Sequence, residues 1–199
     1  METHDSILQF WFGSEIDDKT VAEQRSKLWW SKDPQVDDEI RRRFEPCLAR
    51  ALDREMNSWL ATPRGRLASI LLTDQFPRHI HRDTPEAFAF DPLAHLWCKE
   101  GIGTGADKSL RPIERVFFYL PLEHSECMED QDRSLALFQA LVEDADPEHR
   151  QTFDGFLRFA VRHRDIIKRF GRFPHRNRIL GRELSPEELA FLNQKGSSF

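Results

Sequence analysis

The stretch SLALFQALV, residues 134–142, carries apolar side chains at Leu135, Phe138, Leu141 and Val142. Steps of three and four residues bring such side chains onto one face of an α-helix. A second long segment repeats this spacing over residues 153–167, and shorter stripes of the same kind precede both. No segment of useful length alternates apolar and polar residues as a half-buried strand does. We therefore predict an all-α fold.

Proline positions divide the chain into helices. Six of the eleven prolines follow a residue that can cap a helix N-terminus, namely Asp33, Thr62, Thr84, Asp91, Asp146 and Ser185. We expect about nine helices in antiparallel pairs, forming a degenerate short solenoid over one domain, residues 1–199. We also expect Gly13, Gly101 and Gly171 to end helices, and residues 99–109 to form an irregular loop.

The composition is typical of a soluble chain with an aromatic core. Hydrophobic residues make up 39% of the 199 residues, with 16 Phe and 5 Trp, which is enough for a substantial core. No apolar run approaches the roughly 20 residues that span a bilayer. The N-terminus, with Glu2 and Asp5, does not match a secretory signal, and the three widely spaced cysteines do not suggest a disulfide framework. We expect a cytoplasmic protein without a membrane partner.

Charge is distributed unevenly along a chain whose net charge is −5. Residues 149–182 contain ten Lys and Arg side chains against two acids, and the rest of the chain is acidic. A basic segment of this kind can bind phosphates or nucleic acid. We expect instead that it pairs with the acidic remainder of the same molecule. The overall acidity argues against a nucleic-acid partner.

The run Asp74-Gln75-Phe76-Pro77-Arg78 places charges on a helix face that is otherwise apolar. Asp74 and Arg78 lie four residues apart on that face, a spacing that allows a charge-assisted hydrogen bond. Pro77 has no N–H to donate, so we expect the helix to end there, with His79, His81 and Arg82 in the exit loop. Asp74 can act as a general base or orient a histidine. Equally, the pair can simply lock helix packing.

The run Glu123-His124-Ser125-Glu126 lies in a helix that we expect to begin at Pro121. One face of this helix carries His124 and Gln131 and then continues with apolar residues. Histidine exchanges protons near neutral pH, and an adjacent carboxylate can orient its ring. We expect Glu126 or Asp74 to orient His124. A histidine on an apolar face is more often a satisfied core residue, and here the two interpretations are evenly balanced.

The run Phe170-Gly171-Arg172-Phe173-Pro174-His175-Arg176-Asn177 alternates aromatic and basic residues after a long helix. The rings can anchor the segment while planar guanidinium groups turn towards an anion. In the other interpretation, Arg172 and Arg176 neutralise Asp74 or Glu126 inside the protein. We favour the role in ligand binding.

Motifs for metals and cofactors are weak or missing in the sequence. His79 and His81, or His124 and Glu126, offer ligand atoms, but no spacing typical of a zinc site joins them. The chain also has no P-loop, dinucleotide-binding glycine pattern or G-x-S-x-G elbow. We therefore predict no metal site, and the cofactor stays unknown.

The three runs, in this order, resemble a widespread bacterial family known as domain of unknown function 924. Further matching stretches are residues 10–13, 72–78, 87–91, 114–121, 180–182 and 185–189, so the resemblance covers nearly the whole chain. It implies an all-helical, tetratricopeptide-like fold and no established activity. The family pattern usually has Asn at the position of His79, and an aromatic or apolar residue at that of His81. These histidines either tune a shared site or lie at the surface.

Two kinds of function fit these observations. We predict a buried polar site that binds or acts on a small anionic molecule, and whether the protein is an enzyme is left open. The acid–base candidates are His124, Glu126, Asp74 and His175. The ligand contacts are expected to be Arg78, Arg172, Arg176, Gln75 and Asn177, with Arg82 as a weaker candidate. The alternative is a helical interaction module that binds a peptide or protein in an open groove.

Overall fold

The structure, a computed structural model, describes residues 2–52 and 56–197. Its α-helices are α1 (His4–Phe12), α2 (Asp18–Trp30), α3 (Pro34–Leu52), α4 (Pro63–Ile70), α5 (Phe76–Ile80), α6 (Asp91–Thr104), α7 (Pro112–Glu123), α8 (Met128–Asp144), α9 (Arg150–Phe170), α10 (Pro174–Asn177) and α11 (Pro186–Leu192). Shorter helical turns are η1 (Asn57–Ala61), η2 (Leu71–Gln75), η3 (Pro85–Phe88) and η4 (Ala106–Ser109). These described residues contain no β-strand, so the all-α prediction is confirmed. The tetratricopeptide-like arrangement and the extent of the domain stay predictions.

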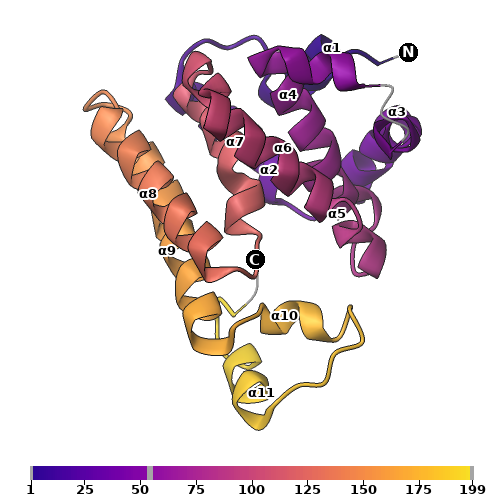
Figure 1. Ribbon diagram of the computed structural model, residues 1–199, viewed down its shortest axis with the longest axis vertical. Coiled ribbons are helices and arrows are strands. Elements are labelled where there is room, and N and C mark those ends of the chain that lie inside the picture. The colour runs from indigo at the N-terminus through magenta and orange to yellow at the C-terminus, as the bar shows by residue number, and fades with distance from the viewer. Residues whose placement is uncertain (1, 53–55, 198–199) are drawn as a thin grey trace.

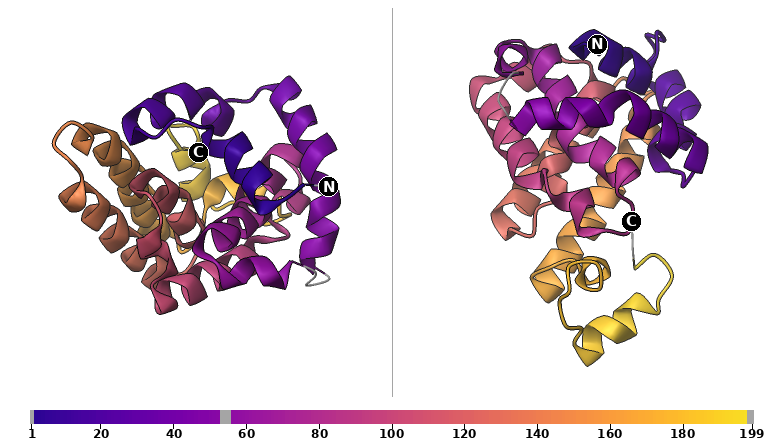
Figure 2. Two further views of the ribbon diagram at one scale, coloured as in Figure 1. Left: turned by 90° about the horizontal axis from the view of Figure 1, so that it is seen from above. Right: turned by 90° about the vertical axis from the view of Figure 1, so that its right-hand side faces the viewer.

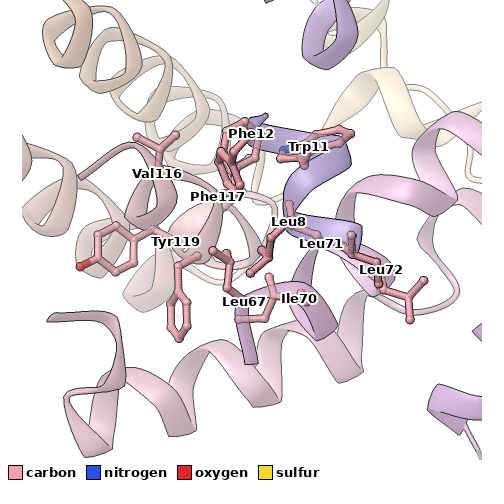
Figure 3. Packing of buried hydrophobic residues seen from close by; sticks show 14 of the residues in the cluster. Leu8, Trp11, Phe12, Leu67, Ile70, Leu71, Leu72, Val116, Phe117 and Tyr119 are labelled. Atoms are coloured by element: carbon pink, nitrogen blue, oxygen red, sulfur yellow. The ribbon is translucent and has the colours of Figure 1, made fainter. Parts of the chain in front are cut away.

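Helices α1, α4 and α7 meet in the main hydrophobic core (Figure 3). Trp11 of α1 is fully buried, and its ring contacts the rings of Phe76 and Phe117 at centroid distances of 5.5 Å. Trp29 of α2 joins the core and donates its indole N–H to the backbone oxygen of Trp11 at 3.0 Å. Buried aromatic pairs of this kind stabilise a core beyond the area they remove from water. The core therefore fixes the α4–η2–α5 segment, which carries Asp74.

Helices α8 and α9 form a long hairpin along one side of the molecule (Figure 1). The segment with α10 and α11 follows at one end, where the further views show it extending from the rest of the chain (Figure 2). A separate apolar cluster of Ile166, Ile167 and Phe173 packs there, with Phe170 and Phe191 at its edge. None of the helices within the described ranges has the length and apolar character needed to cross a membrane.

Several predicted helix boundaries are confirmed. The hydroxyl of Thr62 accepts the N–H of Gly65 at the start of α4, and Ser185 forms the expected capping box at the start of α11. Gly13 and Gly171 end α1 and α9 with positive φ angles, which L side chains rarely adopt.

The prediction that Gly101 ends a helix is wrong, because Gly101 lies inside α6. A Cβ atom at this position would lie 2.4 Å from the ring of Phe118 in α7. The glycine therefore permits close packing of α6 against α7, and the helix ends instead before Gly105. The loop expected over residues 99–109 is also wrong, since α6 and η4 cover most of that range.

The helix expected to begin at Pro121 does not exist in that form. Pro121 lies in the last turn of α7, where its missing N–H weakens the helix shortly before its end. A short connection then leads to α8, and Gln131 of α8 ties the two together. Its amide nitrogen donates to the backbone oxygens of Glu123 and Ser125, each at 2.7 Å. His124 is thus at a helix C-terminus and not on the face of a continuous helix.

Candidate functional site

A π-helical turn, η2 (Leu71–Gln75), joins α4 to α5 and carries Asp74. The N–H of Phe76 bonds to the carbonyl of Leu71, one residue further back than in an α-helix. Pro77 favours this irregularity because it cannot donate the next helical hydrogen bond. The helical path nevertheless continues through α5, so the predicted helix end at Pro77 is wrong. Such π turns occur often at functional sites.

Asp74 lies at the centre of the candidate site and is only 1% exposed. Its Oδ1 lies 2.7 Å from Nδ1 of His124, and its Oδ2 accepts a hydrogen bond from the side-chain amide of Gln75. An ionised carboxylate can only accept hydrogen bonds, so His124 carries its hydrogen on Nδ1. The other ring nitrogen, Nε2, makes no hydrogen bond to any described residue. It is therefore the atom at which His124 can exchange a proton.

Arg78 forms the predicted pair with Asp74, since its Nη1 lies 3.4 Å from Asp74 Oδ1. A second carboxylate, Asp91 of α6, binds the same guanidinium through two hydrogen bonds of 2.8 and 3.0 Å. The two carboxylates neutralise the charge of Arg78, and Asp91 binds the guanidinium in a bidentate way. Arg78 thus ties η2 to α6. A role as ligand contact stays a prediction for Arg78, as it does for Gln75.

Arg176 is less well neutralised than Arg78. It is 7% exposed, and its Nη1 donates to the backbone oxygen of His124 at 3.0 Å. An oxygen of Asp91 lies 3.8 Å from the same nitrogen, which is too far for a hydrogen bond. The Nε atom is buried and has no hydrogen-bond partner among the described residues.

Two aromatic rings hold the guanidinium of Arg176 in place. Its central carbon lies 4.8 Å from the ring centroid of Phe88 and 4.5 Å from that of Phe173. Burial, followed by the charge of Arg78, lowers the pKa of Arg176 to about 10. The group is still cationic at neutral pH. A buried cation with an unbonded donor is a position where an anion would be stabilised.

Asp74 and His124 differ in charge at neutral pH. Burial alone would raise the pKa of Asp74, but the charge of Arg78 and the contact with His124 outweigh it and hold the pKa well below its usual value. Burial lowers the pKa of His124, and the guanidinium groups of Arg78 and Arg176 add to this, although Asp74 opposes them. The pair is therefore a carboxylate and a neutral imidazole. In this form His124 can accept a proton.

Two more histidines lie close to His124. The ring centroid of His163 is 6.2 Å from that of His124, and His163 Nδ1 lies 3.0 Å from Oε1 of Glu123. His175 follows on α10. Burial, and then the charges of Arg176 and His163, lower the pKa of His175 to about 3. His175 is thus neutral at physiological pH, and its acid–base role stays a prediction.

Replacing His175 with glutamine is expected to reduce the loss of stability between pH 7 and pH 5 by about 2 kcal/mol. The pKa of His175 is lowered to about 3 in the folded protein, and an unfolded histidine has a pKa of about 6.5. The unfolded chain therefore binds the extra proton in this interval, and stability falls as the pH falls. Urea unfolding at both pH values measures the difference. Equal losses in the two proteins would contradict the expectation.

Glu126 anchors the C-terminal segment to the connection between α7 and α8. Its Oε1 accepts the backbone N–H of Phe173 at 2.8 Å, and Arg182 binds both carboxylate oxygens at 2.7 and 3.0 Å. Burial would raise the pKa of Glu126, but these two partners lower it. Asp74, not Glu126, is therefore the carboxylate that orients His124. The predicted acid–base role of Glu126 stays untested.

Arg172 and Asn177 belong to a different cluster. Arg172 binds both oxygens of Glu188 at 2.7 and 2.8 Å, and Asn177, which is fully buried, donates to the same carboxylate at 3.1 Å. No hydrogen bond connects Arg172 with Asp74 or His124 in the described part of the chain. The structure thus does not support a site in which Arg172 joins these two residues. Arg176, and not Arg172, lies next to His124.

His79 and His81 also lie apart from Asp74. His79 is buried in α5, so its expected place in an exit loop is wrong, whereas His81 and Arg82 do lie in the turn that follows. The Nδ1 atom of His79 lies 2.8 Å from Oδ1 of Asp37 in α3. Over residues 2–52 and 56–197, no three His, Cys, Asp or Glu side chains are grouped so that they could hold a metal ion.

Part of the basic segment, residues 149–182, is paired with acids of the same protein. The pairs are Arg164 with Asp132, Arg169 with Glu187, Arg172 with Glu188 and Arg182 with Glu126. Partly exposed pairs of this kind contribute little stability each.

Sequence reasoning missed two residues that shape the site. Asp91 binds Arg78, and Arg182 binds Glu126. Both lie in short runs that carry the resemblance to the bacterial family, residues 87–91 and 180–182. This resemblance was a signal by which both residues could have been singled out. Their partners lie 13 and 56 residues away, so no periodicity could identify the pairing.

Comparison with known proteins identifies the family. A family model described as "Bacterial protein of unknown function (DUF924)" matches residues 7–196. The solved structure of the protein of unknown function ATU0120 from Agrobacterium tumefaciens is 38% identical, with a TM-score of 0.80 and 96% of each chain covered. No curated protein shows a significant match. The chain therefore belongs to the DUF924 family of bacterial proteins of unknown function.

Proposed function

We propose that the protein binds a small anionic molecule beside His124 and moves a proton to or from it. Arg176 contacts the anion through its unbonded Nε, and His124 exchanges the proton at Nε2. Asp74 keeps the imidazole oriented and stabilises its protonated form. The observation that carries this proposal is a buried, incompletely bonded guanidinium next to a His–Asp pair.

Burial favours a small ligand over a peptide. Asp74 and Arg176 are 1% and 7% exposed, so a ligand that reaches them must enter the protein. An extended peptide docks along an open surface, where its own backbone can be hydrogen-bonded. The interaction module, which is the alternative function, has no comparable supporting observation among the described residues.

The contacts favour a proton-transfer step over nucleophilic catalysis. A serine nucleophile needs a hydrogen bond to its general base. Ser125 is next to His124 in the chain, but its hydroxyl donates to Asp130 at 2.8 Å instead. A His–Asp pair without a bonded nucleophile suits a reaction in which a proton is removed or added, such as an elimination or isomerisation.

The proposal predicts that a panel of small organic anions contains at least one that raises the melting temperature of the wild-type protein. At a ligand concentration of about 100 times Kd the stabilisation is about 2.7 kcal/mol. We expect this shift to disappear in Arg176→Gln, because the variant lacks the cation, and to persist in Arg172→Gln. The two arginines lie four residues apart, but Arg172 pairs with Glu188 outside the site.

His124 provides a second, independent arm of this experiment. His124→Gln should retain part of the ligand-induced shift but lose any turnover of the same ligand, because the general base is missing. If Arg176→Gln does not fold, Arg176→Lys, which keeps the positive charge, takes its place in the experiment. The proposal is wrong if no anion shifts the wild-type protein, or if Arg172→Gln abolishes the shift as fully as Arg176→Gln does.

A further inference from the structure

A cavity separate from the Arg176 site opens between the first turns of α3 and the turn after α5. Its volume is about 360 Å³, which is within the range of small-molecule sites. Its charged and titratable lining residues are Asp37, Asp38, Arg41, His79, His81 and Arg82. None of them contributes to the site of the proposed function.

Asp37, which lines this cavity, already makes three hydrogen-bond contacts and keeps about one of its four acceptor sites. Its Oδ1 contacts His79 Nδ1 and Arg82 Nη2, each at 2.8 Å, and its Oδ2 accepts a hydrogen bond from Arg82 Nε. Asp38, the second acid, is paired with Arg41 at 2.8 Å. Both carboxylates of the cavity are therefore neutralised by the two arginines that share it.

Unused hydrogen-bond donors remain after these pairs have formed. Arg82 uses Nε and Nη2, and Arg41 uses Nη1 and Nη2, the latter on the backbone oxygen of Ile80. Within the described ranges, neither Nη1 of Arg82 nor Nε of Arg41 has an acceptor. Since guanidinium groups cannot lose their protons in proteins, these atoms can only donate. The cavity thus still offers guanidinium donors to an acceptor-rich ligand.

His81 also lines the cavity, and its ring can donate a hydrogen bond to a ligand. Its Nε2 lies 4.0 Å from Oε1 of Glu45, beyond hydrogen-bond distance, and it lines the cavity from the turn after α5. Thr84 also lies here, but its hydroxyl donates to the backbone oxygen of His81. The side chains that can still donate to a ligand are therefore those of Arg41, His81 and Arg82.

We propose that this cavity binds a small oxyanion, a carboxylate or a phosphate, between Arg41 and Arg82. Planar guanidinium donors match both ligands, because each presents two oxygens in the geometry of the fork. Asp37, which also contacts His79, positions Arg82 by accepting hydrogen bonds from its Nε and Nη2.

Isothermal titration calorimetry with inorganic phosphate and with succinate tests this inference and separates the two ligand chemistries. We expect the wild-type protein to bind one equivalent of at least one probe, with Kd of about 1 mM or tighter. Arg41→Gln should weaken that binding about tenfold, the usual effect of losing one charge-assisted hydrogen bond. Arg41 is partly exposed, so this substitution preserves the fold.

Arg169→Gln is the matched control, because Arg169 is similarly exposed, is also paired with one acid and lies far along the chain in α9. It should bind the probe as the wild-type protein does, and so should Arg176→Gln, which alters the other site. The inference is overturned if the wild-type protein binds neither probe, or if Arg169→Gln weakens binding as much as Arg41→Gln. Loss of binding in Arg176→Gln alone would assign the anion to the other site.

Discussion

Replacing Asp74 with alanine is expected to lower the free energy of unfolding by about 3 kcal/mol. The carboxylate is buried between Arg78, His124 and Gln75, and its removal leaves the donors of His124 and Gln75 without an acceptor. Asp91 still neutralises Arg78, which limits the loss. Urea unfolding with linear extrapolation measures the difference from the wild-type protein.

The pH dependence of this difference provides a further check. The pKa of Asp74 is held below its usual value, so its contribution is fully present above the unfolded pKa of about 4 and is lost as the pH falls below it. Asp132→Ala is a suitable control, because Asp132 forms an exposed pair with Arg164 and should cost less than about 1 kcal/mol. An unchanged stability in Asp74→Ala, with ligand binding lost, would show that the buried carboxylate serves function and not packing.

Phe173→Ala is expected to cost about 3 kcal/mol, mainly by opening the segment with α10 and α11. Phe173 is fully buried in the small cluster with Ile166 and Ile167, which is separate from the main core. Its ring also packs on Arg176, and the variant loses this contact. Hydrogen exchange should therefore become faster in residues 174–192 and stay unchanged in residues 63–80.

Phe159→Ala is the matched control for this experiment, since the side chain of Phe159 is 48% exposed. Its effect should stay within about 0.5 kcal/mol, as for most surface substitutions. If Phe173→Ala raises exchange evenly over the whole chain, the C-terminal segment unfolds together with the rest. That result would contradict local opening and would support the predicted single domain over residues 1–199.

Local sequence pattern was sufficient to predict the helices and one ion pair of the candidate site. Leu135, Phe138 and Leu141 predicted α8 because helix periodicity depends on neighbouring residues only. Ser185 and Gly171 marked the start of α11 and the end of α9 for the same reason. The contact of Asp74 with Arg78 spans four residues, so it too could be predicted from spacing.

Packing overrode local preference where the predictions failed. Pro77 and Pro121 suggested a helix end and a helix start, yet both lie within helical segments. In the first case a π turn absorbs the missing hydrogen bond, and in the second the buried α7 retains the proline in its last turn. Gly101 resembled a stop signal but is needed for the approach of Phe118.

Local patterns were enough to establish that this chain is helical and holds polar groups inside. These patterns were apolar periodicity, helix caps and charged residues on otherwise apolar helix faces. Which of those groups meet depended on the folded chain. His124 contacts Asp74 from 50 residues away and Arg176 from 52, whereas Arg172, only four residues from Arg176, pairs with Glu188 instead. Long-range partners are selected by how whole helices pack, and that free energy is shared among many side chains and is not encoded in any short motif.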